Sequence, residues 1–489
     1  MFPMLSTLIF LPLAGALLLL LFGKISPQIS HLVGIITSAL TLVVVLWMWS
    51  LGINDIGFSH VEQYDWMPAI GAAYRVGVDG ISLPLVLLTA VLFLLSFIFS
   101  ANIKKQSRSY VILMLLLETA AMGTFTALDA ILFYVFFEVS LVSMYFMIAG
   151  WGHEDRQRAA IMFFIYTLLG SLPLLLAILG MYLGSDPHTF DMRVWIAESP
   201  LSGFAAMLAF IAMLFTFAVK IPAFPLHTWL PAAHVQAPAA GSVILAGVML
   251  KFGTYGLIRF SLQMTPEAFR EAATVVLVIG VFSAIYGAFA GLAQTDLKRM
   301  IAYTSVNHMG YVIVAVAIAA MAIEPSTYAI ALDGAVLQMV SHGLVTGALF
   351  FLVGMLQDRA HTRDMHKFGG LLKTVPILAW FFIIASFASL GLPGLAHFPA
   401  EFQIFLATLE VKPLASIVIL GIVITAALYL KAIAAVFLGS ENKQWQSMQD
   451  LSPRELLTLG PLIIFIIVLG VAPSFILDVI HQTTVTLGF

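Results

Sequence analysis

The stretch 213–260 reads MLFTFAVKIPAFPLHTWLPAAHVQAPAAGSVILAGVMLKFGTYGLIRF, and it places two lysines inside apolar runs long enough to cross a membrane. These lysines are Lys220 and Lys251, and a proline-broken segment with His227 and His234 lies between them. A charged residue at bilayer depth costs about 2.5–3.5 kcal/mol on insertion scales. Two such charges in neighbouring spans therefore favour a functional, hydrated path through this region.

The composition of the whole chain agrees with this interpretation. Of its 489 residues, 61% are hydrophobic and 10% are charged, whereas a soluble domain carries about 25% charged residues. We therefore predict a polytopic membrane protein. The sequence contains no cysteine, which excludes disulfides and cysteine-ligated iron–sulfur clusters. Because it also lacks a nucleotide-binding glycine motif, we expect no cofactor site in this chain and electron chemistry in another subunit.

Apolar runs of about 20 residues, the length that crosses a hydrocarbon core, predict fourteen transmembrane helices. We interpret the first as a retained span rather than a signal peptide, because its apolar run is long and many spans follow. The predicted spans are 3–22, 30–51, 81–101, 110–127, 129–150, 159–183, 201–222, 239–261, 272–293, 300–321, 329–356, 375–408, 414–438 and 455–480.

Lysine and arginine are distributed unevenly between the loops, and cytoplasmic loops normally carry the excess. Loops after odd-numbered spans hold fourteen of these residues, and the even side holds five. The bias predicts that the odd loops face the cytoplasm and that both termini lie on the outer side, where loop 52–80 is expected to form a hairpin. The fourteen are Lys24, Lys104, Lys105, Arg108, Arg156, Arg158, Lys298, Arg299, Arg359, Arg363, Lys367, Lys373, Lys443 and Arg454.

Spans seven and twelve are interrupted by similar sequences, VKIPAFPLHTWLP (219–231) and SLGLPGLAHFPAEF (389–402). Each contains prolines, a histidine and an ionisable residue, which are Lys220 and Glu401. Paired interrupted helices in corresponding halves are typical of inverted-repeat transporters. The two breaks are five spans apart, an odd number, so two repeated units would have opposite topology.

Five of the ionisable residues inside predicted spans are Glu138, Lys220, Lys251, Glu401 and Lys431. Unpaired, they would cost of order 10–15 kcal/mol, whereas the stability of a domain is only about 5–15 kcal/mol. They must therefore be paired, hydrated or neutralised. Glu138 is the natural partner of Lys220, because both lie in mid-membrane, and Lys251 lies too deep to reach the interface easily.

Each functional interpretation has a structural alternative. Glu138 could be held by neighbouring hydroxyls, Lys220 could extend to the interface, and Glu401 could bind free amides at a helix start. His308 and His342 fall in adjacent spans among Ser, Thr, Asn and Gln. A lone histidine there is often only a helix contact, but two favour a wetted proton relay, since histidine titrates near pH 6.5.

We expect no metal site at these histidines, because no third and fourth ligand stands at a workable spacing. Asp129 starts a span and is expected to cap it. Secondary relay positions are predicted at Glu118, His227, His234, Asp333 and Lys431.

Four segments together carry a family resemblance: FAVKIPAFPLHTWLPAAHVQAPAAGSVILAGVMLK, QTDLKRMIAYTSVNHMGYV, LQMVSHGLVTGALFFLVG, and FASLGLPGL followed by EF. They closely resemble the subunit M family of bacterial NADH-quinone oxidoreductase (respiratory complex I), whose members are proton antiporter-like membrane subunits. The likeness runs from about residue 75 to the end of the chain.

The resemblance implies an all-α fold of about fourteen transmembrane helices, with two inverted five-helix repeats, broken helices 7 and 12, and a proton channel. Helices 1–3 would occupy 1–108, the repeats 109–262 and 270–440, and a cytoplasmic segment with helix 14 would occupy 441–489. By motif, Glu138 and Lys220 form the coupling ion pair, Lys251 is the central lysine, His308 and His342 are relay histidines, and Glu401 is the terminal acid.

The resemblance also implies that NADH, FMN, iron–sulfur clusters and quinone belong to partner subunits in a bacterial plasma membrane. Paralogous antiporter-like subunits and lipids would be neighbours, and no nucleic acid is expected. Members of the family usually read LPDAHVEAPTAGS where this chain reads LPAAHVQAPAAGS (230–242). Ala232 and Gln236 thus replace two acids at the cytoplasmic mouth of the channel, and Ala239 replaces a threonine. The chain departs again at the second break, which contains His397, Pro399 and Ala400.

Three functions remain open from the sequence. The first is a proton-translocating subunit of a complex I-type oxidoreductase. The second is a subunit of a multi-subunit cation/proton antiporter or a membrane-bound hydrogenase, and the third is a scaffold that only docks neighbours.

Overall fold

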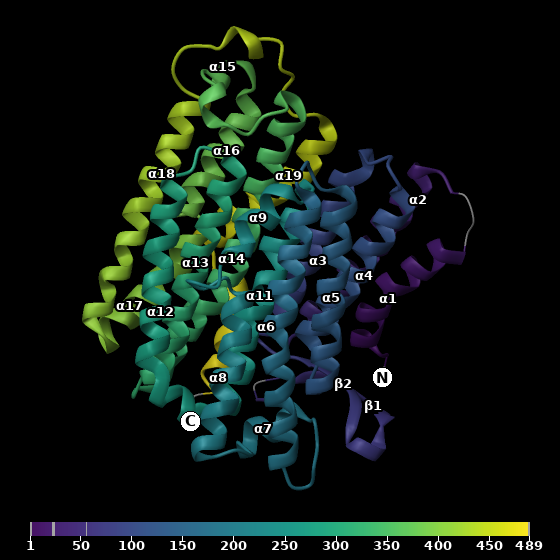
Figure 1. The fold of residues 1–489 in the computed structure, drawn as a ribbon, viewed down its shortest axis with the longest axis vertical. Coiled ribbons are helices and arrows are strands. Elements are labelled where there is room, and N and C mark those ends of the chain that lie inside the picture. Colours follow the sequence, from purple (N-terminus) through teal and green to yellow (C-terminus); the bar gives the residue numbers. More distant parts are fainter. Residues whose placement is uncertain (1, 22–24, 55, 488–489) are drawn as a thin grey trace.

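The computed structural model describes residues 2–21, 25–54 and 56–487, and it is a bundle of long helices with one small hairpin (Figure 1). Lys24, one of the basic residues counted above, lies outside the described residues. The helices are α1 (Met4–Leu21), α2 (Pro27–Leu51), α3 (Ser82–Phe99), α4 (Ser107–Thr126), α5 (Ala130–Trp151), α6 (Arg156–Gly184), α7 (Met192–Glu198), α8 (Gly203–Lys220), α9 (Trp229–Gln236), α10 (Ala239–Ile244), α11 (Leu250–Gly256), α12 (Pro266–Leu292), α13 (Leu297–Met321), α14 (Pro325–Ala360), α15 (Leu371–Thr374), α16 (Pro376–Ser389), α17 (His397–Val411), α18 (Leu420–Val436), α19 (Pro453–Val471) and α20 (Ser474–Thr484).

Within the described residues, thirteen helices are long and apolar enough to cross a membrane. The pair α16 and α17 forms the broken span that completes the predicted set. The all-helical membrane fold predicted from hydropathy is therefore confirmed.

The spans differ in how much of their surface the rest of the protein covers. The span 239–262 and α14 are completely buried over their most apolar windows, and α13 is 94% buried. In contrast, α19 is 33% buried and α2 and α6 are 39% buried. Because span 239–262 and the central part of α14 have no outward face, the polar side chains there must be accommodated inside the protein.

Both predicted helix breaks are present. α8 ends at Lys220 and α9 begins at Trp229, whereas α16 ends at Ser389 and α17 begins at His397. Prolines in each break remove backbone donors, and Gly391 in the second break has a φ of 75°, which favours glycine. Each break exposes the free carbonyls of one helix end and the free amides of the next inside the bundle.

Span 239–262 contains a feature that hydropathy did not predict. Two π-helical segments, η3 (Leu245–Met249) and η4 (Leu257–Leu262), flank the short α11 that carries Lys251. π-helical turns are rare and occur frequently at functional sites. Gly253 packs against the end of α8, since a Cβ there would lie 2.8 Å from the backbone nitrogen of Ile221. The helix that carries Lys251 therefore contacts the chain next to Lys220.

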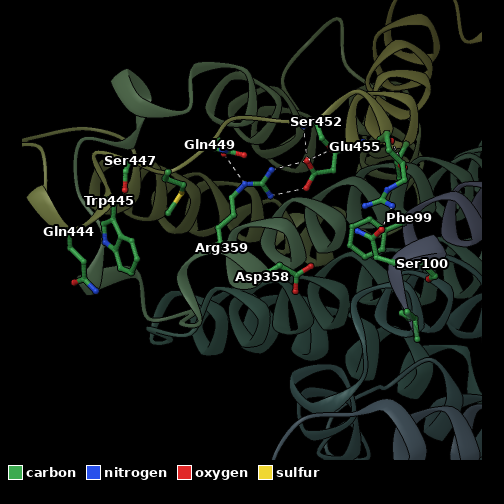
Figure 2. Close-up of a pocket in the computed structure, with 15 residues that line it drawn as sticks. Phe99, Ser100, Asp358, Arg359, Gln444, Trp445, Ser447, Gln449, Ser452 and Glu455 are labelled. Carbon is green, nitrogen blue, oxygen red and sulfur yellow. Dashed lines mark hydrogen bonds and ion pairs between the residues drawn. The ribbon is translucent and has the colours of Figure 1, made fainter. Parts of the chain in front are cut away.

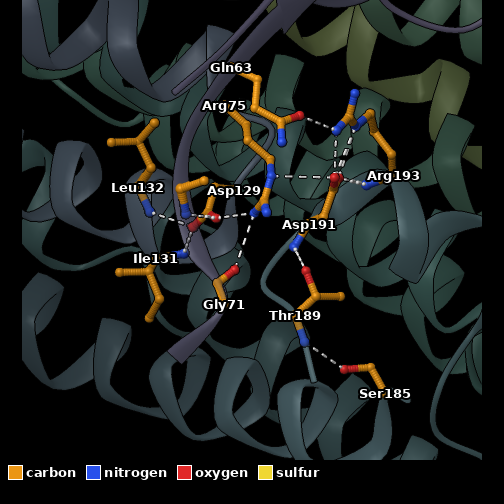
Figure 3. A network of polar contacts seen from close by, with 11 residues as sticks. Gln63, Gly71, Arg75, Asp129, Ile131, Leu132, Ser185, Thr189, Asp191 and Arg193 are labelled. Atoms are coloured by element: carbon orange, nitrogen blue, oxygen red, sulfur yellow. Dashed lines mark hydrogen bonds and ion pairs between the residues drawn. The ribbon is translucent and has the colours of Figure 1, made fainter. Parts of the chain in front are cut away.

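Loop 52–80 forms the expected hairpin, with β1 (Ser59–Met67) antiparallel to β2 (Ala72–Val78). Arg75 on β2 binds Asp129 at 2.7 Å and approaches Asp191 at 3.5 Å, and Arg193 binds the same Asp191 (Figure 3). Asp129 also caps α5, as expected, because its carboxylate accepts from the first backbone amides of that helix. This network fastens the hairpin to α5 and α7, at the end of the bundle where both chain ends lie (Figure 1).

The last predicted span, 455–480, is wrong in its extent. α19 ends at Val471 and a separate helix, α20, begins at Ser474, because Pro473 has no backbone N–H with which to continue α19. The connection before α19 crosses the opposite end of the bundle. There Arg359 binds the Glu455 carboxylate through two nitrogens, at 2.7 and 2.8 Å (Figure 2).

Candidate functional site: a buried line of lysine, histidine and glutamate

Lys251 is the centre of the site. Its side chain is completely buried, and its Nζ lies 2.7 Å from Nδ1 of His342 on α14 and donates to the carbonyl oxygen of Ala246 at 2.6 Å. That carbonyl is five residues earlier in the chain, within the π-helical segment η3. The irregular helix therefore gives a buried lysine one fixed carbonyl and one titratable neighbour.

His342 belongs to a compact group of three histidines. The ring centroids of His308 on α13 and His342 are 5.6 Å apart, and those of His308 and His397 are 4.5 Å apart. The rings of His342 and His397 are nearly parallel at 6.3 Å. All three side chains are buried. The sequence prediction paired His308 with His342, and the structure brings His397 into the same group.

The second helix break organises this group. The carbonyl oxygen of Ser389, the last residue of α16, accepts from His308 Nε2 at 2.9 Å and lies 3.4 Å from His397 Nδ1. A helix C-terminus leaves its last carbonyls without partners inside the helix. The break at Ser389 therefore supplies the acceptor that orients two of the three rings.

Glu401 lies one turn into α17 and is buried. Its Oε1 accepts from Gln338 at 3.4 Å and lies 3.9 Å from His308 Nε2 and 3.7 Å from His397 Nδ1. Its Oε2 packs against Gly391, where a Cβ would overlap with that oxygen. The carboxylate thus fits into the break only because residue 391 has no side chain.

The histidine and glutamate side chains of this group are close enough together to be considered as ligands of a metal ion. His308, His397 and Glu401 each offer one atom, and these atoms lie within 4.8 Å of one another, so third-ligand candidates do exist among the described residues. However, His308 Nε2 donates its proton to the Ser389 carbonyl, whereas a metal ligand needs a free lone pair on that nitrogen. The ammonium of Lys251, next to His342, also disfavours a second cation. We assign no metal here.

Glu138 and Lys220 do not form the direct ion pair that the resemblance implied: among the described residues, no salt bridge joins them. Lys220 is buried, and its Nζ lies 4.7 Å from the ring centre of Phe137 and 5.7 Å from that of Phe252. Glu138 on α5 lies beside Ser171, and its charge interacts with that of Lys220. The charges of the two residues therefore interact without a direct ion pair, while the Lys220 ammonium lies over two aromatic rings.

The two histidines of the first break lie in different surroundings. His227 packs among Phe224, Tyr286 and Tyr303. His234 is buried face to face with Phe350, at 4.6 Å, and neither of its ring nitrogens has a partner among the described residues. The charges of both Lys251 and Lys298 act on His234.

Lys298 was counted as a loop cation, but its side chain is completely buried at the start of α13. Its Nζ donates to the carbonyl oxygen of Ala237 at 2.5 Å. The charges of Asp296, Asp358 and Arg363 act on Lys298. These three residues line a polar cavity of about 650 Å³ together with His153, Glu154, Gln236, Gln357, His361, Thr362 and Asp364. The lining includes four acidic residues, Glu154, Asp296, Asp358 and Asp364.

His153 lies in the loop between α5 and α6, at the rim of that cavity. Burial, together with the positive charges of Lys298 and Arg363, lowers the pKa of His153 to about 4. Its Nε2 lies 3.3 Å from the Gln357 amide. His153 is therefore neutral near pH 7 and contributes a hydrogen-bonding ring to the mouth rather than a charge.

Three of the predicted secondary relay residues lie apart from this line. Glu118 accepts from Ser38 on α2 at 2.8 Å. Asp333 binds His481 of α20 at 2.7 Å, near the end that carries the hairpin. Lys431 donates to the carbonyl oxygen of Leu292 at 2.8 Å, so it satisfies the C-terminal end of α12.

The buried pair of Arg259 and Asp79 was not predicted from the sequence. Arg259 in η4 is 1% exposed and forms a salt bridge with Asp79, which precedes α3. The signal was present in the sequence, since an arginine inside predicted span 239–261 requires a partner. No comparable signal marked Lys298, which follows a polar turn.

Known proteins resemble this chain along nearly its whole length. Residues 127–428 match the family described as NADH:quinone oxidoreductase/Mrp antiporter, TM. NADH-quinone oxidoreductase subunit M of Rickettsia prowazekii (strain Madrid E) is 40% identical over 98% of this chain and 97% of its own.

Solved structures give the same result for the fold. A chain of respiratory complex I from Thermus thermophilus matches with a TM-score of 0.89 and 30% identity, over 99% of both chains. A chain of the Mrp complex from Dietzia sp. DQ12-45-1b matches with a TM-score of 0.85 and 20% identity, over 99% of this chain and 97% of that one. At 20% identity the second match shows a shared fold.

Proposed function

The chain belongs to the NADH:quinone oxidoreductase and Mrp antiporter transmembrane family, and we propose that it is a proton-translocating membrane-arm subunit of a complex I-type NADH-quinone oxidoreductase. Its relatives of about 40% identity are named as subunit M of that enzyme. It acts as one component of a multi-subunit translocase, and paralogous antiporter-like subunits are its neighbours.

One observation carries this proposal: the contact of 2.7 Å between Lys251 and His342 inside completely buried spans. A static scaffold gains nothing from a buried ammonium, because taking a charge out of water costs several kcal/mol. A proton-transfer site does require such a group, since lysine, histidine and glutamate take and release protons. His308 and Glu401 extend the line from His342 toward the second break.

We assign the proton-transfer roles to Glu138, Lys220, Lys251, His308, His342 and Glu401. We assign the mouth of the path to the polar cavity near Lys298, and the step between this mouth and Lys251 to His234, on which the charges of both lysines act. We place this mouth on the cytoplasmic side, because the basic loops after spans five, nine and eleven line it, and the two chain ends on the outer side.

The driving force comes from other subunits. Moving one charge against 100 mV requires about 2.3 kcal/mol, and this chain has no cysteine with which to bind an iron–sulfur cluster. We infer that NADH, FMN, iron–sulfur clusters and quinone are held by partner chains. Their redox chemistry would change the position or charge of Glu138 and Lys220, and so the affinity of Lys251 for a proton.

The test is proton pumping by the assembled complex in proteoliposomes, with Lys220→Ala and Lys251→Ala in this subunit. We expect either variant to assemble and to translocate several-fold fewer protons per electron. The control is Lys373→Ala, because Lys373 is 76% exposed and pairs with Glu441 at the surface. Normal pumping by both variants would show that the chain is a scaffold.

A subunit of a multi-subunit cation/proton antiporter is the second candidate, and the shared fold with a chain of the Mrp complex supports it. The two candidates differ in their partners. Purification of the native assembly should bring down a peripheral arm that oxidises NADH. Small membrane subunits without any redox centre would instead favour the antiporter.

A further inference from the structure

We propose that His397 is a third proton-relay residue, which transfers the proton from the His308–His342 pair to Glu401. This inference rests on the proposed function and adds a residue at which neither the sequence pattern nor the resemblance placed a role. His397 is the first residue of α17, directly after the second helix break.

The position of His397 connects it to the terminal acid. His397 and Glu401 are four residues apart on one helix, so they lie on the same face. His397 Nδ1 lies 3.7 Å from Glu401 Oε1, slightly closer than His308 Nε2 at 3.9 Å. Since N–H···O hydrogen bonds form at about 2.7–3.2 Å, a displacement of about 1 Å would make this contact a hydrogen bond.

The hydrogen bond of His308 to Ser389 disfavours direct transfer of a proton from His308 to Glu401. Its Nε2 carries a proton that is donated to the Ser389 carbonyl at 2.9 Å, because a carbonyl oxygen only accepts. His397 shares the same carbonyl at 3.4 Å, a longer and weaker contact. Its Nδ1–H can therefore turn between Ser389 and Glu401 at little energetic cost, whereas that of His308 is held.

The opposite side of the ring provides the acceptor. His397 Nε2 is buried and forms no full hydrogen bond among the described residues, although the Ser341 backbone interacts with the ring. His308 Nδ1 and His342 Nε2 are likewise buried without a hydrogen-bond partner in this part of the chain. Buried nitrogens without partners are costly, so their concentration in one cluster points to groups that exchange protons with each other. The ring of His308 lies 4.5 Å from that of His397 and 5.6 Å from that of His342.

The transfer step balances without any further reactant. His397 Nε2 takes up one proton from the cluster and the ring becomes an imidazolium cation. Its Nδ1 then releases the other proton to Glu401 Oε1, and the ring is neutral again with its proton on Nε2. Rotation of the side chain, or a second exchange with the cluster, restores the first tautomer.

The test uses His397→Asn in the assembled complex, measured as protons translocated per electron in sealed membrane vesicles. An asparagine amide retains a donor near the position of Nδ1 and can still bind Ser389, but it cannot carry a proton. His31→Asn is the matched control, because His31 is also buried and binds the carbonyl of Ile103 at 2.9 Å, outside the cluster. Glu401→Gln is the reference for a blocked path.

We expect His397→Asn to assemble normally, to lower proton translocation at least threefold, and to alter the solvent isotope effect on pumping, measured as the ratio of rates in H₂O and D₂O. His31→Asn should behave as wild type. Wild-type pumping and isotope effect in His397→Asn, with Glu401→Gln blocked, would overturn the relay role and leave the proposed function standing. Normal pumping by Glu401→Gln would instead reject the proposed function.

A second variant, His397→Gln, places its amide nitrogen near Nε2 and guards against a folding failure. It should pump as poorly as His397→Asn. Failure of both amide variants to assemble, while His31→Asn assembles, would show that His397 is required for packing and would reject the relay.

Discussion

Lys251 and His342 are in direct contact inside the protein: Nζ of the lysine lies 2.7 Å from Nδ1 of the histidine, and both side chains are completely buried. The two side chains compete for protons, because a second positive charge at this distance is unfavourable in a low-dielectric interior. A proton on one of them therefore favours release from the other.

Replacement of His342 should interrupt this exchange. We expect His342→Gln to lower proton translocation about tenfold or more, which corresponds to about 1.4 kcal/mol in the transfer barrier. Quinone reduction and proton translocation are measured together in vesicles, with His31→Gln as the control for loss of a buried histidine. Full pumping by His342→Gln would remove His342 from the path.

The buried pair of Arg259 and Asp79 predicts a stability effect rather than a transport effect. Arg259→Leu leaves an unpaired buried carboxylate, and removing one partner of a buried ion pair costs about 3–5 kcal/mol. We expect a marked loss of assembled complex and a lower thermal midpoint. The double variant Arg259→Leu, Asp79→Asn should recover much of this loss, since the introduced amide oxygen can still accept from the backbone amide of Ile81, as the Asp79 carboxylate does. Equal losses in the single and double variants would contradict the explanation.

The helices and both breaks were predictable because hydropathy and proline are properties of a local stretch. Lys220, Lys251 and Glu401 were predictable for a similar reason: a charge inside an apolar run is anomalous wherever it points. Spatial grouping was not predictable in this way. His397 joins His308 only because α16 ends at Ser389 and α17 restarts beside α13, and no spacing in the sequence encodes that contact.

The irregular helix geometry around Lys251 could not be predicted from the sequence either. The π-helical segments around Lys251 depend on packing of span 239–262 against its neighbours, and no residue type signals them. Glu138 and Lys220 do not pair directly, and the Lys220 ammonium lies instead over the rings of Phe137 and Phe252. Partner choice inside a membrane depends on these neighbours as well as on charge.

The hairpin network in Figure 3 predicts unequal roles for two arginines. Arg75 is 12% exposed and pairs with Asp129, a carboxyl whose pKa is raised by burial despite that partner. Arg193 is 35% exposed. We expect Arg75→Ala to cost about 3 kcal/mol and Arg193→Ala about 0–1 kcal/mol. Thermal inactivation and proteolysis within residues 56–71 would measure both, and similar sensitivity of the two variants would argue against burial as the cause.

The opposite end of the bundle depends on Arg359 (Figure 2). Besides Glu455, it donates to the carbonyl oxygens of Gln449 and Asp450, at 2.8 and 3.1 Å. A lysine cannot reproduce this set, because its single nitrogen lacks the planar fork of arginine. We expect proteolysis within 439–452 to accelerate in Arg359→Ala and, to a smaller extent, in Arg359→Lys. Lys373→Ala removes the exposed ion pair of Lys373 with Glu441 in the same connection, and it should accelerate cleavage less than Arg359→Ala. Equal cleavage rates in Arg359→Ala, Arg359→Lys and Lys373→Ala would contradict the role assigned to Arg359.

His153 predicts a pH dependence at the cavity mouth. The pKa of His153 is about 4 in the folded protein and ordinarily 6.5. Between pH 4 and pH 6.5 the unfolded chain is therefore protonated at His153 to a greater extent than the folded protein. The contribution of a neutral His153 to stability is therefore fully present above about pH 6.5 and decreases as the pH falls toward 4. His153→Gln retains an amide that can bond to Gln357 but does not titrate. Thermal midpoints of the wild type should consequently fall more steeply between pH 6.5 and 4.5 than those of His153→Gln. Lys298 and Arg363 contribute to the low pKa of His153, so in an Arg363→Gln background the thermal midpoints with and without His153→Gln should differ less in their pH dependence. Parallel pH dependences of the thermal midpoint in wild type and His153→Gln would show that protonation of His153 does not destabilise the folded protein.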